Sequence, residues 1–126
     1  MIKAIALVGL GGGIGSILRY LTSLLVNRYY NSAFPLATFI INIAGCFLIG
    51  LLFGFMEKQG LANDNFKYLF ITGFCGGYTT FSTFAHENVT LLQSNNPLTA
   101  FIYIGFSVFA GLLAVGAGMY LIHLVK

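Results

Sequence analysis

Four long apolar segments constrain the fold of this 126-residue chain more than any other feature. An α-helix needs about 20 apolar residues to cross the roughly 30 Å hydrocarbon core of a bilayer. The segments that reach this length cover approximately residues 4–26, 35–56, 68–92 and 98–125. The polar connections between them are short. The sequence therefore predicts an all-α membrane protein in which residues 1–126 form a single domain of four transmembrane helices.

Composition agrees with this class. The chain is 58% hydrophobic and 7% charged, whereas a soluble domain carries about 25% charged residues. Its six basic residues are scattered, so we expect no nucleic-acid partner. No nucleotide motif or catalytic constellation stands out, and we do not expect an enzyme. The sequence predicts a multi-pass protein surrounded by a lipid bilayer.

The first segment is rich in glycine. It does not contain the spacing G-x-G-x-x-G of a dinucleotide loop, because Ile14 and Ser16 occupy the required positions. Two pairs of small residues, Gly9 with Gly13 and Gly11 with Gly15, instead favour close packing of one transmembrane helix against another.

The number of spans and the distribution of charge predict the orientation. Four spans place both termini on the same side of the membrane. Lys3, Lys58, Lys67 and Lys126 fall on that side, whereas Arg28 follows the first span on the other. The positive-inside rule then favours cytoplasmic termini.

The stretch Gly73–Glu87, GFCGGYTTFSTFAHE, departs from an ordinary transmembrane helix. Gly76 and Gly77 favour an interruption near the centre of the third helix, and the carbonyl groups that it frees would suit a cation such as sodium. An interruption at this depth survives only inside protein or beside a polar cavity. After it, Phe81 and Phe84 share one helix face. Thr80, Thr83 and Glu87 form a polar line beside the two rings. Because ring edges carry positive potential, they could line a path for an anion.

Polar residues in the other segments have two interpretations each. Asn42, in the middle of the second segment, either makes an interhelical hydrogen bond or donates to a passing anion. Arg19 either extends toward the lipid headgroups or attracts an anion to a pore mouth. Tyr103, Ser107 and Gly111 lie four residues apart on one helix face, which could form another wall of a path.

These motifs together resemble the Fluc (CrcB-type) family of fluoride channels over essentially the whole chain. The resemblance is carried by GGGIGSILRY in the first segment, Asn42 followed by Gly45 in the second, and GFCGGYTTFSTF in the third. It implies an antiparallel, dual-topology homodimer with two pores that passively export cytoplasmic fluoride. It also implies a central structural sodium ion, held by the backbone carbonyls of Gly76 and Thr79.

The resemblance assigns roles to further residues. Phe81 and Phe84 match the paired pore phenylalanines, and Asn42 matches the pore asparagine. The remaining matched positions form a hydroxyl track with a carboxylate beyond it, and two pore-facing positions of the last helix; these are Ser82, Thr83, Glu87, Tyr103 and Ser107. The chain departs from the family pattern where Ala37 replaces a usual glycine and where Gly111 lacks a hydroxyl.

Two other classes of protein fit four short spans. A small proton-coupled multidrug exporter, also a dimer, would need an acidic residue within the membrane, and Glu87 alone could serve. A structural subunit of a larger membrane complex is the second alternative.

Overall fold

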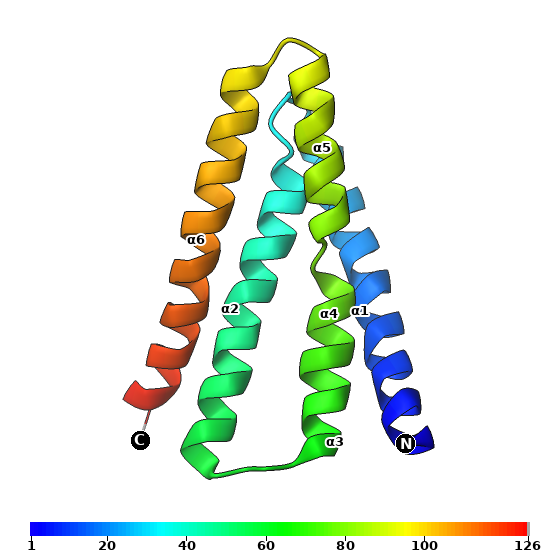
Figure 1. Ribbon diagram of the computed structural model, residues 1–126, viewed down its shortest axis with the longest axis vertical. Coiled ribbons are helices and arrows are strands. Elements are labelled where there is room, and N and C mark those ends of the chain that lie inside the picture. Colours follow the sequence, from blue (N-terminus) through cyan, green and yellow to red (C-terminus); the bar gives the residue numbers. More distant parts are fainter. Residues whose placement is uncertain (126) are drawn as a thin grey trace.

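The computed structural model describes residues 1–125, which form helices joined by short connections and contain no β-strand (Figure 1). Lys126, one of the lysines used above to predict orientation, lies outside the described residues. Three of the helices are long and apolar enough to cross a membrane: α1 (Ile2–Tyr29), α2 (Leu36–Gln59) and α6 (Pro97–Leu124). The chain is therefore a multi-pass membrane protein.

The remaining apolar segment consists of several helical pieces. These are α3 (Asp64–Phe66), the π-helix η1 (Lys67–Cys75), α4 (Gly76–Tyr78) and α5 (Phe81–Gln93). The first three follow one another directly, and α5 continues above them in Figure 1, past the start of α2 and beside the beginning of α6.

The position predicted for the interruption at Gly76–Gly77 is wrong. Both glycines are helical and belong to α4. The residues with extended backbone are Thr79 (φ −80°, ψ 158°) and Thr80 (φ −148°, ψ 117°). The physical reason is a partner on another helix, because the side chain of Asn42 on α2 binds the extended backbone of Thr80.

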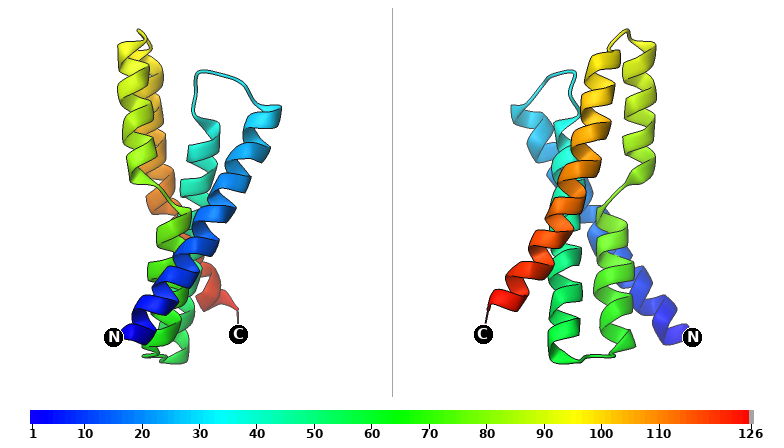
Figure 2. Two further views of the ribbon diagram at one scale, coloured as in Figure 1. Left: turned by 90° about the vertical axis from the view of Figure 1, so that its right-hand side faces the viewer. Right: turned by 60° about the vertical axis from the view of Figure 1, so that its left-hand side comes forward.

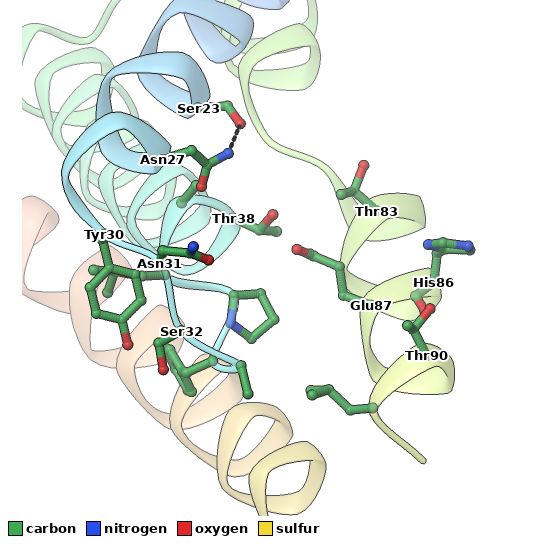
Figure 3. A pocket seen from close by; sticks show the side chains of 16 residues that line it. Ser23, Asn27, Tyr30, Asn31, Ser32, Thr38, Thr83, His86, Glu87 and Thr90 are labelled. Carbon is green, nitrogen blue, oxygen red and sulfur yellow. Dashed lines mark hydrogen bonds between the residues drawn. The ribbon is translucent and has the colours of Figure 1, made fainter. Parts of the chain in front are cut away.

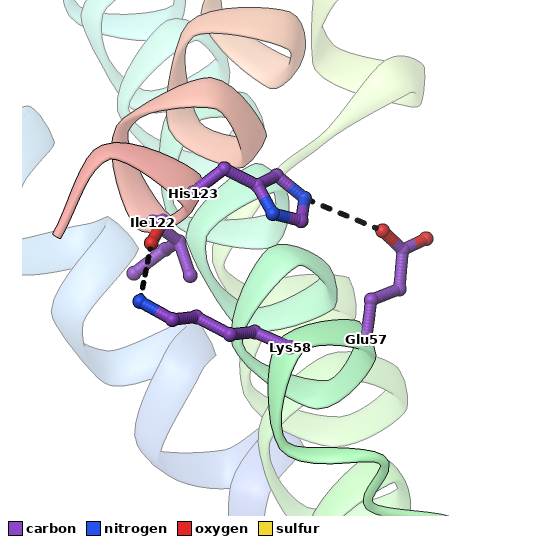
Figure 4. Close-up of polar contacts among 4 residues, drawn as sticks. All are labelled: Glu57, Lys58, Ile122 and His123. Carbon is purple, nitrogen blue, oxygen red and sulfur yellow. Dashed lines mark hydrogen bonds and ion pairs between the residues drawn. The ribbon is translucent and has the colours of Figure 1, made fainter. Parts of the chain in front are cut away.

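The N-terminus and the end of α6 lie at the same end of the molecule as the connection between α2 and α3, at the bottom of Figure 1. Lys58 at the end of α2 donates a hydrogen bond to the backbone oxygen of Ile122 on α6 (3.1 Å). Beside it, His123 and Glu57 approach to 3.8 Å (Figure 4). Both side chains of this pair are more than half exposed, so water screens it and it contributes little stability.

Glycines allow α1 to pack closely on the third span. A Cβ atom at Gly11 would overlap backbone atoms of Leu69 and Phe74, and one at Gly15 would overlap those of Phe74 and Tyr78. The predicted role of Gly11 and Gly15 in close packing is therefore confirmed. Gly9 and Gly13 differ, since a Cβ atom at either would meet nothing within 4 Å in residues 1–125.

The helices diverge at the end away from the termini. Figure 2 shows α5 and the beginning of α6 separating there from the end of α1. At this end a small core forms between α5 and α6 around Leu91, Ala100 and Tyr103, of which the last two are fully buried. Phe34, Phe39 and Phe84 pack against this core.

Candidate functional site

Asn42 and Thr80 fix the extended segment between α4 and α5. The side-chain amide of Asn42 donates from Nδ2 to the backbone oxygen of Thr80 (3.0 Å). The backbone N–H of Thr80 donates in return to Oδ1 of Asn42 (2.8 Å). The predicted interhelical hydrogen bond of Asn42 is thereby confirmed. Its amide nitrogen carries a second hydrogen, so donation to another group remains chemically open to it.

The extended segment changes the bonding of two backbone carbonyls. In a continuous α-helix, the N–H of Thr80 would donate to the carbonyl of Gly76 and that of Thr83 to Thr79. Here the first N–H donates to Asn42, and the second donates to Oγ1 of Thr80 (3.2 Å). The carbonyls of Gly76 and Thr79 thus lose the donors that a helix would give them.

The Thr80 hydroxyl is the N-cap of α5. Thr80 is buried, with 7% of its surface exposed. Its Oγ1 accepts from the backbone of Thr83, donates to Oγ1 of Thr83 (3.1 Å) and lies 3.4 Å from Oγ of Ser82. A cap of this kind typically contributes about 0.5–2 kcal/mol. Thr80, predicted only as one member of a polar line, therefore organises the start of α5.

Polar groups of α1 bind the other side of the interruption. The hydroxyl of Ser16 donates to the backbone oxygen of Gly77 (3.4 Å). The hydroxyls of Thr22 and Tyr78 lie 3.2 Å apart and share a hydrogen bond. Helices α1 and α2 thus both bind the residues around the extended segment.

A cavity of about 430 Å³ lies beside this segment, and we call it the central cavity. Gly76, Thr79, Thr80, Asn42, Ser107, Phe81 and Phe84 line it, together with both cysteines, Cys46 and Cys75. Its wall is partly open in a single chain, because Phe81 is 79% exposed. The Oγ atom of Ser107 is buried and has no hydrogen-bond partner among residues 1–125.

A row of aromatic rings leads away from the central cavity. The centroids of Phe81 and Phe84 are 5.8 Å apart. Phe84 in turn contacts Tyr103 edge to face, with centroids 5.0 Å apart and the ring planes at 70°. The hydroxyl of Tyr103 donates to Oε1 of Glu87 (3.2 Å). These contacts form a continuous connection from the central cavity to the Glu87 carboxylate.

Glu87 extends into a second cavity, of about 470 Å³, which we call the polar cavity. Figure 3 shows its carboxylate directed toward Thr38. The walls come from the end of α1, residues 30–35, the start of α2, and α5. The polar side chains among them are Ser23, Asn27, Tyr30, Asn31, Ser32, Thr38, Thr83, His86, Glu87 and Thr90. Phe81 and Phe84 line the central cavity, whereas Glu87, which accepts from Tyr103, lines the polar cavity.

Most residues proposed from the sequence lie in or between these cavities, with two exceptions. Ser82 is exposed on α5 and contacts Thr80. Arg19 lies half-buried on α1 and lines neither cavity. Gly111, on the predicted stripe with Tyr103 and Ser107, is buried against α2, where an added Cβ would lie 3.5 Å from Sγ of Cys46.

Sequence reasoning missed one aromatic residue. Phe34, in the connection before α2, lines the polar cavity and contacts the ring of Tyr103. The only local signal was an aromatic side chain directly before Pro35 at the start of a span.

Comparison with known proteins identifies the family. The model of the family described as CrcB-like protein, Camphor Resistance (CrcB), matches residues 6–119. A protein of Flavobacterium psychrophilum named fluoride-specific ion channel FluC is 57% identical, over 93% of this chain and 94% of the relative. Proteins of the same name from Azobacteroides pseudotrichonymphae and Ignicoccus hospitalis are 51% and 41% identical, each over at least 92% of both chains. The chain therefore belongs to the CrcB-like protein family.

Proposed function

We propose that this chain forms a fluoride-selective passive channel that exports cytoplasmic fluoride, as a dual-topology homodimer with two pores. One observation carries the proposal beyond the names of the relatives. The row Phe81–Phe84–Tyr103 connects the central cavity with the polar cavity inside a protein that spans the membrane. Neither a soluble enzyme nor a simple structural subunit requires such a connection.

The chemistry along this row suits a small, strongly hydrated anion. Moving an ion into a low-dielectric environment is very costly unless other groups replace its water. The second N–H of Asn42 and the buried, unpartnered hydroxyl of Ser107 are available donors in the central cavity. The positive edges of the two phenylalanine rings come next, and the hydroxyl of Thr83 stands in the polar cavity. Chloride, which is larger and accepts hydrogen bonds more weakly, gains less from the same donors.

The exposure of the central cavity supports a dimer. Phe81 is 79% exposed in a single chain, and Gly76 beside the same cavity is exposed as well. A path for an ion needs a closed wall, and a second copy placed over this surface would supply it. The antiparallel arrangement follows the resemblance described above.

The freed carbonyls fit the sodium ion that the family resemblance implies. Carbonyl oxygens are suitable ligands for a hard cation, and carbonyl dipoles replace the hydration shell of ions in channels. Gly76 and Thr79 each offer one such oxygen at the edge of the central cavity, and a second copy would bring the same pair. Bound there, sodium would add a favourable potential for an anion without a basic residue in the path.

A growth experiment tests the function. Cells that lack their own fluoride exporter should regain growth in fluoride-containing medium when they express this chain. A fluoride channel relieves the accumulation of the ion, whereas a multidrug exporter or a structural subunit does not. Rescue from toxic cationic dyes but not from fluoride would contradict the proposal.

A further inference from the structure

Phe34 lies outside the helices, in the connection between α1 and α2, yet its ring contacts two others. It packs edge to face against Phe39 in the first turn of α2, with centroids 5.7 Å apart and planes at 65°. It packs in the same way against Tyr103 on α6, with centroids 5.2 Å apart and planes at 65°. Phe34 therefore joins the connection and the start of α2 to the middle of the proposed ion path.

Tyr103 is the residue that this contact can control. It is fully buried. Its ring also contacts Phe84, and its hydroxyl donates to Glu87. A tyrosine ring turns as a rigid unit, so any movement that shifts the ring edge from Phe84 also displaces the hydroxyl from the carboxylate. The orientation of this one side chain therefore sets both contacts.

The backbone around Phe34 is held in place. Its carbonyl accepts a hydrogen bond from the N–H of Leu36 (2.8 Å), which closes a tight turn around Pro35. Proline restricts the backbone further, because its φ angle is fixed. The ring stands at the boundary between the polar cavity and the core around Leu91 and Ala100. A smaller side chain at this position would leave space beside Tyr103.

We propose that Phe34 is a positioning residue for the ion path. It holds Tyr103 in the orientation in which the ring edge meets Phe84 and the hydroxyl reaches Glu87. It acts through Tyr103 and does not itself need to contact the ion. This inference rests on the proposed channel function and adds a residue of the connection to the determinants of the conduction rate.

A double-mutant cycle in liposomes tests the inference. Purified wild type, Phe34→Leu, Tyr103→Leu and the double variant are reconstituted at equal amounts, and fluoride efflux is followed with an electrode. We expect Phe34→Leu to slow efflux about two- to tenfold, the range given by the loss of one edge-to-face aromatic pair. We expect the same substitution to have no further effect once Tyr103 is leucine. Equal factors in both backgrounds would overturn the inference.

Two further variants separate positioning from folding. Phe34→Tyr keeps the ring and should retain efflux close to wild type, whereas Phe34→Met, which keeps a long apolar side chain but not the aromatic edge, should be slow. Phe55→Leu is the matched control, since its ring packs near Phe66 at the opposite end of the molecule (6.1 Å between centroids). It should leave the rate unchanged. Wild-type protein that releases no fluoride would overturn the proposed function itself, whereas an active wild type with a fully active Phe34→Met variant would overturn only the role of Phe34.

Discussion

The side-chain amide of Asn42 pairs with the backbone of Thr80 through two hydrogen bonds, of 3.0 Å and 2.8 Å. The side chain of Asn42 on α2 thus hydrogen-bonds both the N–H and the C=O of Thr80 in the third span. This interaction helps an extended segment persist within the spanning part of the chain, because it satisfies both backbone groups of Thr80. It also diverts the donor that the carbonyl of Gly76 would otherwise receive.

Replacing Asn42 should destabilise the protein. In Asn42→Asp the carboxylate can still accept from the Thr80 N–H but cannot donate to its carbonyl oxygen, which is left without this donor. We expect a loss of about 1–3 kcal/mol, the cost of leaving a buried polar group without a partner. A lower midpoint of thermal unfolding in detergent would report it. Asn27→Asp is the control, because the amide of exposed Asn27 donates only to Ser23 on its own helix. Equal midpoints for the two variants would contradict the role of Asn42.

Removing the Thr80 hydroxyl should weaken the start of α5. Thr80→Val keeps the shape of the side chain but leaves the N–H of Thr83 without its cap. We expect a loss of about 0.5–2 kcal/mol, visible in thermal unfolding and as faster amide hydrogen exchange in the first turn of α5. Thr80→Ser, which keeps the hydroxyl, should retain most of the stability that Thr80→Val loses. Thr90→Val, which loses only an exposed bond to the His86 carbonyl, is the comparison. If amide hydrogens in the first turn of α5 exchange as slowly in Thr80→Val as in wild type, the Thr80 hydroxyl does not stabilise the start of this helix.

The glycines of α1 should differ sharply in their tolerance of alanine. Gly15→Ala would push a methyl group into the backbone of Phe74 and Tyr78, which cannot move away as a flexible side chain can. Overpacking of this kind typically costs about 1–3 kcal/mol. Gly13→Ala meets open space and should unfold at the wild-type temperature or slightly above, since alanine favours helix. A higher unfolding temperature for Gly15→Ala than for Gly13→Ala would contradict the close packing of α1 on the third span.

Sodium should stabilise the protein if the carbonyls of Gly76 and Thr79 bind it. Any ligand of the native state raises the unfolding midpoint in proportion to the logarithm of its concentration once it exceeds the dissociation constant. We expect the midpoint to rise with sodium chloride and to stay lower in N-methylglucamine chloride of the same ionic strength. Identical midpoints in both salts at every concentration would argue against a sodium site.

The apolar spans and the close packing of Gly11 and Gly15 follow from the sequence because both depend on local pattern. The position of the interruption did not follow. Adjacent glycines lower helix propensity wherever they occur, but Thr80 is held extended by a partner that lies far away in the chain. The same reason applies to Phe34 and Tyr103, whose contact brings a connection against a distant helix. No feature of Lys67–Cys75 that we recognise in the sequence indicated a π-helix.

The polar line predicted on the third segment was partly informative. Thr83 and Glu87 are four residues apart, share a helix face and both line the polar cavity, as their spacing indicated. Thr80 was counted with them, but it precedes α5 and lies at the central cavity. Helical spacing ceases to apply where the helix begins. The assignment of these residues to a fluoride path stays a prediction.

The phenylalanine rings should control the rate of conduction. In Phe84→Ile the edges toward both Phe81 and Tyr103 are lost, and we expect efflux slower by about tenfold or more. Phe109→Ile, on a side chain that is 64% exposed on α6, is the control and should conduct normally. An elution profile on size exclusion that matches wild type would show that the variants remain folded. Unchanged efflux in Phe84→Ile would remove the rings from the path.

Selective efflux from liposomes tests the central claim most directly. Vesicles loaded with equal concentrations of potassium fluoride and potassium chloride, and containing the purified wild-type protein, are treated with valinomycin, and both anions are followed with selective electrodes. The account predicts rapid release of fluoride while chloride stays inside. Release of both anions at similar rates, or of neither, would contradict it.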